Sequence, residues 1–341
     1  MISKVVTTAR FNNLKELPEA AKRAERLGYD TLHVGEHQHN AFLPLLLAAE
    51  HTQRIHVATN VAIAFARSPM VTAYAAWDLQ GYSGGRFELG LGTQVKAHIT
   101  RRFGMEWGRP VGRLKDYILA LRDIFACWQN GTKLDHQGEF YNLTLMIPYF
   151  SPGPVQNPQI PFFISAVGPQ MCKLAGQVCD GISPHHFHTV KYLQDVVFPT
   201  FKAGAESAGR DVKTLDFKVG VLLASGDTEE ELGKGRQRLR KDISFYASTP
   251  AYRGVLDAHG WTDLGEKLHL MSREGKWEAM AQEIPADIVE EFAVVAKYDD
   301  LAKVIKKRYK NLATAINLTL PASANIEEER LASIIKEIKS P

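Results

Sequence analysis

The sequence predicts a single (β/α)8 barrel, and three observations lead to this fold class. Short segments of β-forming apolar residues alternate with segments of helical apolar spacing, and the joints between them are short. The alternation gives eight strands and eight helices, which is the composition of such a barrel. The 341 residues, 45% of them hydrophobic, are enough to bury a large core. Strands joined through helices form a parallel sheet with right-handed crossovers.

The first half of the chain supplies four of the predicted strand–helix pairs. Apolar residues recur on one face between residues 14 and 27, and Gly28 is expected to end this helix. A Gly-Gly turn opens the fourth strand, which ends on Gly90 and Gly92. Glycines at a strand end let the backbone approach a ligand closely, so we expect a ligand there. The predicted strands are 5–9, 30–36, 55–64 and 86–91, and the helices are 14–27, 43–51, 69–82 and 113–128.

The second half resumes this alternation, but two segments break it. Residues 134–154 contain a hairpin signature, and residues 227–291 are polar and helical with an aromatic middle that includes Tyr246, Tyr252 and Trp261. Insertions of this size usually cap the C-terminal face of a barrel, so we expect both over that face of one domain spanning residues 1–341. The remaining strands are predicted at 161–166, 181–183, 215–224 and 314–320. The remaining helices are predicted at 171–178, 192–208 and 326–338, and the helical segment 227–291 completes the eight.

The composition excludes some classes of function. A formal charge of +3, from 41 basic and 38 acidic residues, gives no nucleic-acid footprint, although a local basic pocket could still take an anionic ligand. The three cysteines lack metal-ligand spacing and are typical of core residues in a reducing compartment. The N-terminus leads directly into a strand pattern, and no apolar run is long enough to span a membrane. We therefore expect a soluble, cytoplasmic protein that acts on a small molecule.

Three ionisable side chains lie at or just after the end of the second predicted strand, where a barrel places its functional residues. They are Glu36, His37 and His39. A histidine suits proton transfer near neutral pH, and a neighbouring carboxylate can orient it. His37 is therefore a candidate acid or base, with Glu36 beside it. The alternative is that these side chains are solvated loop residues.

The residues from His33 to His37 match a pattern found in one class of zinc peptidase, but the predicted structure does not suit that chemistry. Such a site needs its two histidines one turn apart on a helix. This segment is rich in β-forming residues, so the two rings would lie about 13 Å apart along an extended chain. No metal site is predicted. His185, His186 and His188, which follow a short strand, are assigned to pocket lining or simple exposure.

The residues Ala166, Val167, Gly168 and Pro169 predict a phosphate site. A strand ends at Ala166, Gly168 permits close backbone approach, and Pro169 suits the first position of a helix. The free N–H groups at such a helix N-terminus bind phosphate. The alternative is an ordinary strand-to-helix joint. The glycines of the fourth strand lack the third glycine of a dinucleotide fingerprint, so a Rossmann domain is not predicted.

Several motifs occur in an order and spacing that characterise one family. They are AFARSPM at 64–70, SGGRFELGLG at 83–92, GTQVKAHITRRF at 92–103, AVGP at 166–169, DG at 180–181 and STPAYR at 248–253. Together they resemble the bacterial-luciferase-like flavin and deazaflavin oxidoreductases, and most closely the branch that depends on coenzyme F420. The resemblance covers nearly the whole chain. It implies a (β/α)8 barrel, a homodimer, and binding of FMN or the deazaflavin coenzyme at the C-terminal mouth.

The resemblance also implies roles for individual residues. Glu36 and His37 would face the cofactor ring and the substrate. A bulge behind the ring would contain a non-prolyl cis peptide between Asn60 and Val61. The other implied contacts are Thr93, Gln94 and His98 on the ring or its ribityl chain, Ala166 to Pro169 on the phosphate, and His39, Tyr246 and Tyr252 beside or over the substrate.

The chain departs from the family pattern at two places. Val95 stands where some deazaflavin enzymes carry a glutamate just after the fourth-strand glycines, so that proton donor has no counterpart here. Residues 295–298 read Val-Ala-Lys-Tyr where relatives usually have Val-Gly-x-Pro. This second difference is expected to affect only a turn.

The sequence therefore predicts an F420-dependent oxidoreductase that transfers a hydride to or from a small organic substrate. His37 would handle the proton, oriented by Glu36 or by a loop carbonyl. An FMN-dependent monooxygenase that activates oxygen is an alternative, because both cofactors share a tricyclic ring, a ribityl chain and a phosphate. The deazaflavin adds an acidic tail, so a basic groove of Lys96, Arg101 and Arg102 would favour it, whereas these side chains could also form a solvated face. A non-catalytic relative that binds flavin is a third alternative.

Overall fold

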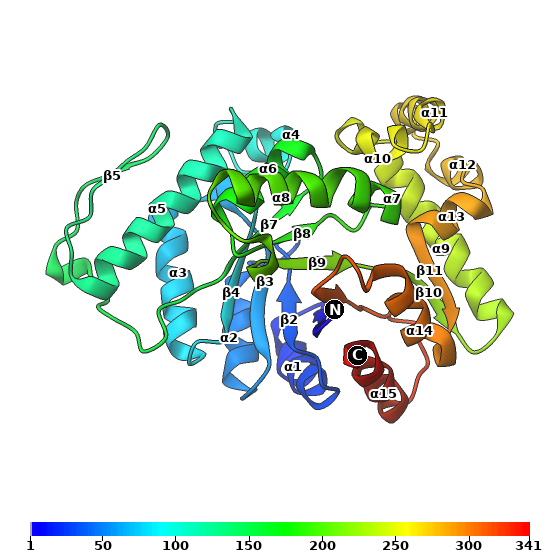
Figure 1. Ribbon diagram of the computed structural model, residues 1–341, viewed down its shortest axis with the longest axis horizontal. Helices are drawn as coiled ribbons and strands as arrows, with labels where there is room; N and C mark the ends of the chain where they lie inside the picture. The colour runs from blue at the N-terminus through cyan, green and yellow to red at the C-terminus, as the bar shows by residue number, and fades with distance from the viewer. Residues whose placement is uncertain (1) are drawn as a thin grey trace.

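The computed structural model describes residues 2–341, and a closed barrel of parallel strands forms its centre (Figure 1). Around the barrel the strands follow the order β1-β12-β9-β8-β7-β4-β3-β2. Each strand predicted from the sequence contributes to it, so the (β/α)8 prediction is confirmed. The strands are β1 (Lys4–Thr8), β2 (Thr31–Val34), β3 (His56–Ile63), β4 (Phe87–Gly92), β7 (Phe162–Ala166), β8 (Gly181–Pro184), β9 (Asp216–Gly220) and β12 (Ala315–Asn317).

Helices connect the strands and pack around the outside of the barrel (Figure 1). Their ends follow from local sequence: Ser68 caps α3 by accepting the Val71 N–H at 3.3 Å, and Gly28 follows α1 with a φ of 86°, as predicted. The helices outside the 227–291 insertion are α1 (Leu17–Arg26), α2 (Phe42–Glu50), α3 (Pro69–Tyr82), α4 (Lys96–Arg101), α5 (Pro110–Asn130), α6 (Pro169–Val178), α7 (Val190–Tyr192), α8 (Phe198–Ser207), α14 (Tyr298–Tyr309) and α15 (Glu328–Lys339).

The 227–291 insertion is helical, as predicted, but a small parallel sheet that the sequence reading missed anchors it. The segment predicted as one strand at 215–224 divides into β9 and β10 (Leu222–Gly226), and β10 pairs with β11 (Ala293–Lys297) outside the barrel. The expectation that residues 295–298 form only a turn is therefore wrong, because they end β11 and begin α14. The helices of the insertion are α9 (Glu229–Ala247), α10 (Arg253–Asp257), α11 (Thr262–Arg273), α12 (Trp277–Gln282) and α13 (Ala286–Phe292).

The 134–154 segment forms the predicted hairpin, β5 (His136–Gln137) and β6 (Asn142–Leu143), but its position corrects our expectation. It packs beside α3 and α5 on the outside of the barrel, at the opposite edge of Figure 1 from α10 to α13. The Tyr74 hydroxyl donates to the Phe150 carbonyl at 2.9 Å, and the Trp77 indole donates to the Gly153 carbonyl at 3.0 Å. These contacts direct the segment to the helix layer, whereas the 227–291 insertion reaches the barrel mouth.

Candidate functional site

The candidate site lies at the carboxyl ends of the barrel strands, because parallel pairing brings those ends to one mouth. Glu36, His37 and His39 follow β2, and Thr93 and Gln94 follow β4. His98 lies on α4, a helix that the sequence reading missed. Asn60 and Val61 lie in the second half of β3, and the residues from Ala166 to Pro169 join β7 to α6. The barrel thus gathers the predicted residues of its strand ends at the same mouth.

The Asn60–Val61 peptide bond is cis, as the family resemblance implied. The register between β3 and β4 shifts between Thr59 and Ala62, which places the bond within a bulge. The two fourth-strand glycines pack against this bulge: a Cβ at Gly90 would overlap the Thr59 carbonyl oxygen, and one at Gly92 would lie 2.6 Å from Cγ2 of Val61. The expectation that these glycines make room for a ligand is therefore wrong, since neighbouring chain fills the space.

Glu36 is buried at the end of β2, and its carboxylate is bound on both oxygens. The Ile63 N–H donates to Oε2 at 2.7 Å, and the Arg67 guanidinium binds both oxygens, with Nη1 2.8 Å from Oε2. Within residues 2–341 no hydrogen bond joins Glu36 to His37. The suggestion that Glu36 orients His37 is thus not supported, and the carboxylate instead ties the end of β2 to the end of β3.

His37 is exposed at the mouth, and its ring folds back over Gly35. A Cβ at Gly35 would lie 2.8 Å from Nε2 of His37 and 3.2 Å from the Asn60 carbonyl oxygen, so the imidazole lies beside β3. The Arg102 guanidinium, which follows α4, donates to the His37 carbonyl at 2.7 Å. The backbone is thus held in place while the ring nitrogens stay accessible at the mouth.

His33 lies on strand β2, two residues before Gly35, inside the barrel. The Asn60 amide nitrogen is 3.2 Å from His33 Nδ1, and because an amide nitrogen only donates, Nδ1 is the acceptor. Burial, and secondarily the positive charge of Lys218, lowers the pKa of His33 to about 3, so the ring is neutral. The sequence reading considered His33 only as a metal ligand and missed this support for Asn60.

Rings from the insertion and from the loop after β8 pack together at the mouth. His185 stacks between His186, at 4.3 Å between ring centroids, and Tyr252, at 4.7 Å. Tyr246 meets all three rings edge-on. Burial lowers the pKa of His185 to about 2 and raises that of Tyr252 to about 12, so both are neutral near pH 7. The structure therefore brings the predicted Tyr246 and Tyr252 against the loop histidines.

The N-terminus of α6 is open, as a phosphate site requires. Gly168 is its N-cap residue, Pro169 is exposed, and a Cβ at Gly168 would meet no atom within 4 Å. The Tyr192 hydroxyl donates to the Val167 carbonyl at 3.0 Å and fixes the preceding loop. Pro169 has no N–H, and the Met171 and Cys172 N–H groups both donate to the Gly168 carbonyl at 3.1 Å. Within residues 2–341 the Gln170 N–H is therefore the donor that this turn leaves for a phosphate.

The remaining predicted residues occupy separate positions around the mouth. His39 stacks on Phe11, with ring centroids 5.2 Å apart, and so packs on the loop after β1. Gln94 adopts a left-handed φ of 57°, and its side-chain oxygen accepts the Val95 N–H at 2.9 Å. Thr93 is half-buried, and His98 is exposed on α4.

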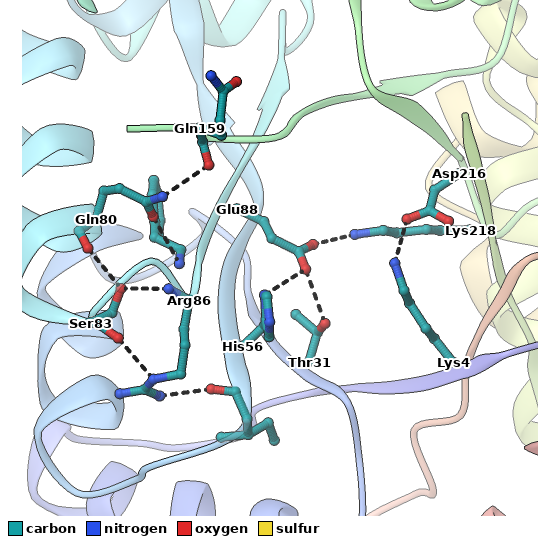
Figure 2. A network of polar contacts seen from close by, with 12 residues as sticks. Lys4, Thr31, His56, Gln80, Ser83, Arg86, Glu88, Gln159, Asp216 and Lys218 are labelled. Atoms are coloured by element: carbon teal, nitrogen blue, oxygen red, sulfur yellow. Dashed lines mark hydrogen bonds and ion pairs between the residues drawn. The ribbon is translucent and has the colours of Figure 1, made fainter. Parts of the chain in front are cut away.

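A second polar network, which the sequence reading missed, lies at the amino-terminal end of the barrel (Figure 2). Glu88 of β4 pairs with Lys218 of β9, and its other oxygen lies 3.3 Å from both the Thr31 hydroxyl and Nδ1 of His56. Lys4 pairs with Asp216 at 2.8 Å beside it. The signal was the presence of charged residues inside two predicted strands, Glu88 in 86–91 and both Asp216 and Lys218 in 215–224. This network lies away from the mouth.

Among residues 2–341, none of the helices combines the length and the hydropathy of a membrane span. The same residues contain no group of three or more His, Cys, Asp or Glu side chains placed to hold a metal ion.

The fold and the grouping of ionisable and aromatic side chains at the C-terminal mouth define a barrel enzyme. The chain belongs to the luciferase-like monooxygenase family, whose model matches residues 2–315. An uncharacterized protein of Mycobacterium tuberculosis is 42% identical over 328 residues, covering 96% of both chains. An F420-dependent glucose-6-phosphate dehydrogenase of Amycolatopsis mediterranei is 27% identical over 309 residues, covering 86% of this chain and 85% of that one.

Among solved structures, the coenzyme F420-dependent tetrahydromethanopterin reductase of Methanopyrus kandleri has the same fold. The TM-score is 0.80 with 20% identity, and the match covers 99% of each chain. With the family membership and the dehydrogenase relative, these findings identify the chain as an oxidoreductase.

Proposed function

We propose that this oxidoreductase uses coenzyme F420 to transfer a hydride to or from a small alcohol or carbonyl compound. The observation that carries the proposal is His37, an accessible imidazole at the end of β2 beside the β3 bulge. The F420-dependent dehydrogenase relative supports the choice of cofactor, because its identity to this chain extends over most of the barrel.

The residues at the mouth suit a ribityl-phosphate cofactor. The open N-terminus of α6, with residues 166–169, would hold the phosphate, since the space beside Gly168 is unfilled. Asn60, Val61, Thr93, Gln94 and His98 would contact the ring and the ribityl chain. Lys96 and Arg101, both exposed on α4, would face the acidic tail, whereas Arg102 is held by the His37 carbonyl.

When bound, the deazaflavin supplies a two-electron hydride carrier that reacts poorly with oxygen. The chain itself has three tasks. His37 exchanges the proton of the substrate's hydroxyl or carbonyl group, because its ring nitrogens are accessible at the mouth. Arg102 holds the backbone of His37, and the insertion, with Tyr246 and Tyr252 at its inner side, excludes water from the reacting groups.

An FMN-dependent monooxygenase is the second candidate, and the family model itself favours it. The open α6 N-terminus serves either cofactor equally well, because both carry a phosphate on a ribityl chain. The acidic tail is the feature that separates them. The basic side chains of α4 therefore support the deazaflavin.

The test is an anaerobic titration of the purified protein with oxidised coenzyme F420 and, separately, with FMN, followed by fluorescence quenching. We expect tight binding of F420 and weak binding of FMN. A panel of secondary alcohols, ketones and enones then identifies the substrate through the absorbance change of the coenzyme. Preference for FMN together with oxygen consumption would replace the proposal with the monooxygenase. Binding of neither would refute both.

A further inference from the structure

His186 follows β8 and lies across the mouth from His37. Its Cβ would be 3.3 Å from a Cβ at Gly220, the last residue of β9, so the side chain starts beside that strand. His37 lies beside β3. In the closed barrel β3 and β9 are separated by three strands in either direction, β8, β7 and β4 on one side and β12, β1 and β2 on the other. The two imidazoles therefore begin at opposite sides of the mouth.

The other two histidines of this loop have ring nitrogens that are either engaged by the protein or buried away from the mouth. Nδ1 of His185 accepts the Phe187 N–H at 3.1 Å, and Nε2 lies 3.4 Å from the Tyr252 hydroxyl. Nε2 of His188 donates to the Gly220 carbonyl at 3.0 Å. Nδ1 of His188 has no partner within residues 2–341, but this ring is buried, so a substrate at the mouth does not reach it. Within residues 2–341 the half-buried His186 ring has no hydrogen-bond partner. His186 is thus the histidine of the loop whose nitrogens are left for a ligand.

The His186 ring is nevertheless held in one orientation. It stacks on His185 with ring centroids 4.3 Å apart and an interplanar angle of 28°. Tyr246, which belongs to the insertion, meets the His186 ring edge-on with ring centroids 4.9 Å apart. Burial, and secondarily the charge of His37, lowers the pKa of His186 to about 4, so the His186 ring is neutral near pH 7.

We propose that His186 is a second substrate-contacting residue, which hydrogen-bonds the reacting oxygen of an alcohol or carbonyl substrate from the side of the mouth opposite His37. The inference rests on the proposed function. A neutral imidazole offers one donor and one acceptor, so it donates to a carbonyl oxygen and accepts from a hydroxyl without changing its own protonation. No bond is made or broken at His186. His37 exchanges the proton, and His186 fixes the oxygen against it.

The test compares three variants after the substrate panel has identified a substrate. His186→Phe keeps a flat ring against His185 and Tyr246 but removes both nitrogens, and His186→Gln restores a donor and an acceptor. His51→Phe is the matched control, because His51 ends α2 outside the candidate site. We expect His186→Phe to lower kcat/KM roughly tenfold, the effect of one lost hydrogen bond, and His186→Gln to recover part of that loss.

Two readouts separate this role from a structural one. The Kd of each variant for oxidised F420, measured by the same titration, should stay within about twofold of the wild type. In the F420-loaded wild type, the ring-nitrogen NMR signals of His186 should shift when the ketone of the substrate pair is added, whereas those of His188 should not. A His186→Phe variant with wild-type kcat/KM, or unchanged His186 signals, would overturn the inference. Wild-type protein that binds no F420 would instead refute the proposed function.

Discussion

The carboxylate of Glu36 and the guanidinium of Arg67 form a bidentate ion pair next to His37. Glu36 follows β2 and Arg67 precedes α3, and their side chains are 8% and 14% exposed. The pair also receives the Ile63 N–H, so it joins the ends of β2 and β3. The sequence suggests Glu36 as part of the proton-transfer chemistry, but in the structure Glu36 fixes the backbone that carries His37.

Replacing Glu36 with Gln should lower stability without changing the pH dependence of turnover. The substitution leaves the Arg67 charge buried without its partner, which costs about 3 kcal/mol of unfolding free energy. Urea unfolding measures the loss, and the pH profile of kcat/KM should keep its midpoint. Glu19→Gln is the control, since Glu19 and Lys22 form an exposed pair whose loss should hardly change stability. A shifted midpoint in Glu36→Gln would return Glu36 to the proton-transfer step.

The pair of Glu88 and Lys218 should show strong coupling between its members. Their side chains are 8% and 4% exposed, and the Lys218 ammonium also lies 3.4 Å from the centre of the Phe163 ring. Lys218→Met leaves a buried carboxylate without its lysine partner and should cost about 3–5 kcal/mol, whereas adding Glu88→Gln should restore much of the loss. Urea unfolding of the two single variants and the double variant measures the coupling. Additive losses would contradict it.

The Glu88 carboxyl also predicts acid sensitivity. Burial alone would raise its pKa, but the charge of Lys218 and the hydrogen bonds from His56 and Lys218 outweigh burial and hold the pKa well below its ordinary 4.5. A lowered carboxyl pKa contributes stability that is present above the ordinary value and is lost as the pH falls below it. The cost of Lys218→Met should therefore shrink below about pH 4.5, where the unpaired carboxyl is protonated.

The neutral, buried His33 predicts a different pH dependence. Its pKa is about 3 in the folded protein and 6.5 ordinarily, so between these values the unfolded chain binds a proton that the folded chain does not. The stability contributed by neutral His33 is present above 6.5 and is lost as the pH falls. Between about pH 7.5 and about pH 5.5, the wild type should therefore lose about 1.4 kcal/mol relative to His33→Gln. Parallel unfolding curves for the two proteins across this range would exclude a neutral His33.

Sequence predicts the barrel well because each strand and helix carries its own apolar period, which a local reading detects. The split of residues 215–224 into β9 and β10 was not detected, since the chain leaves the barrel to pair with β11, about seventy residues away. The pairing of Glu88 with Lys218 spans 130 residues and depends on barrel closure in the same way. The glycines at 90 and 92 stand out in the sequence, but the reason for them does not. They are needed because the bulge of β3 packs against them, which is a contact between strands.

Within the candidate site, the positions at strand ends were predictable and the partners of the side chains were not. The position of His37 follows from the end of β2, and parallel strands place it at the mouth. The capture of Glu36 by Arg67 needs the β3 segment folded beside β2. The stacking of His185 between His186 and Tyr252 needs the insertion docked on the mouth, and no local pattern encodes that docking.

The contact between Gly35 and His37 offers a direct way to test the role of the imidazole. His37→Ala should lower turnover roughly a hundredfold and leave the Kd for F420 within about twofold, because it removes only the proton-exchanging group. In Gly35→Ala the added methyl group would lie 2.8 Å from Nε2 of His37, so the ring must move while its chemistry is kept. We expect this variant to lower kcat roughly tenfold through misplacement of the imidazole.

The matched control for Gly35→Ala is Gly233→Ala on α9, where a Cβ meets no atom within 4 Å. This change should leave kcat unchanged and raise stability by about 0.5 kcal/mol, since alanine restricts the unfolded chain. Stopped-flow measurement of coenzyme reduction in all three variants separates the chemical step from product release. If His37→Ala and Gly35→Ala both reduce the coenzyme at the wild-type rate, another group must exchange the proton.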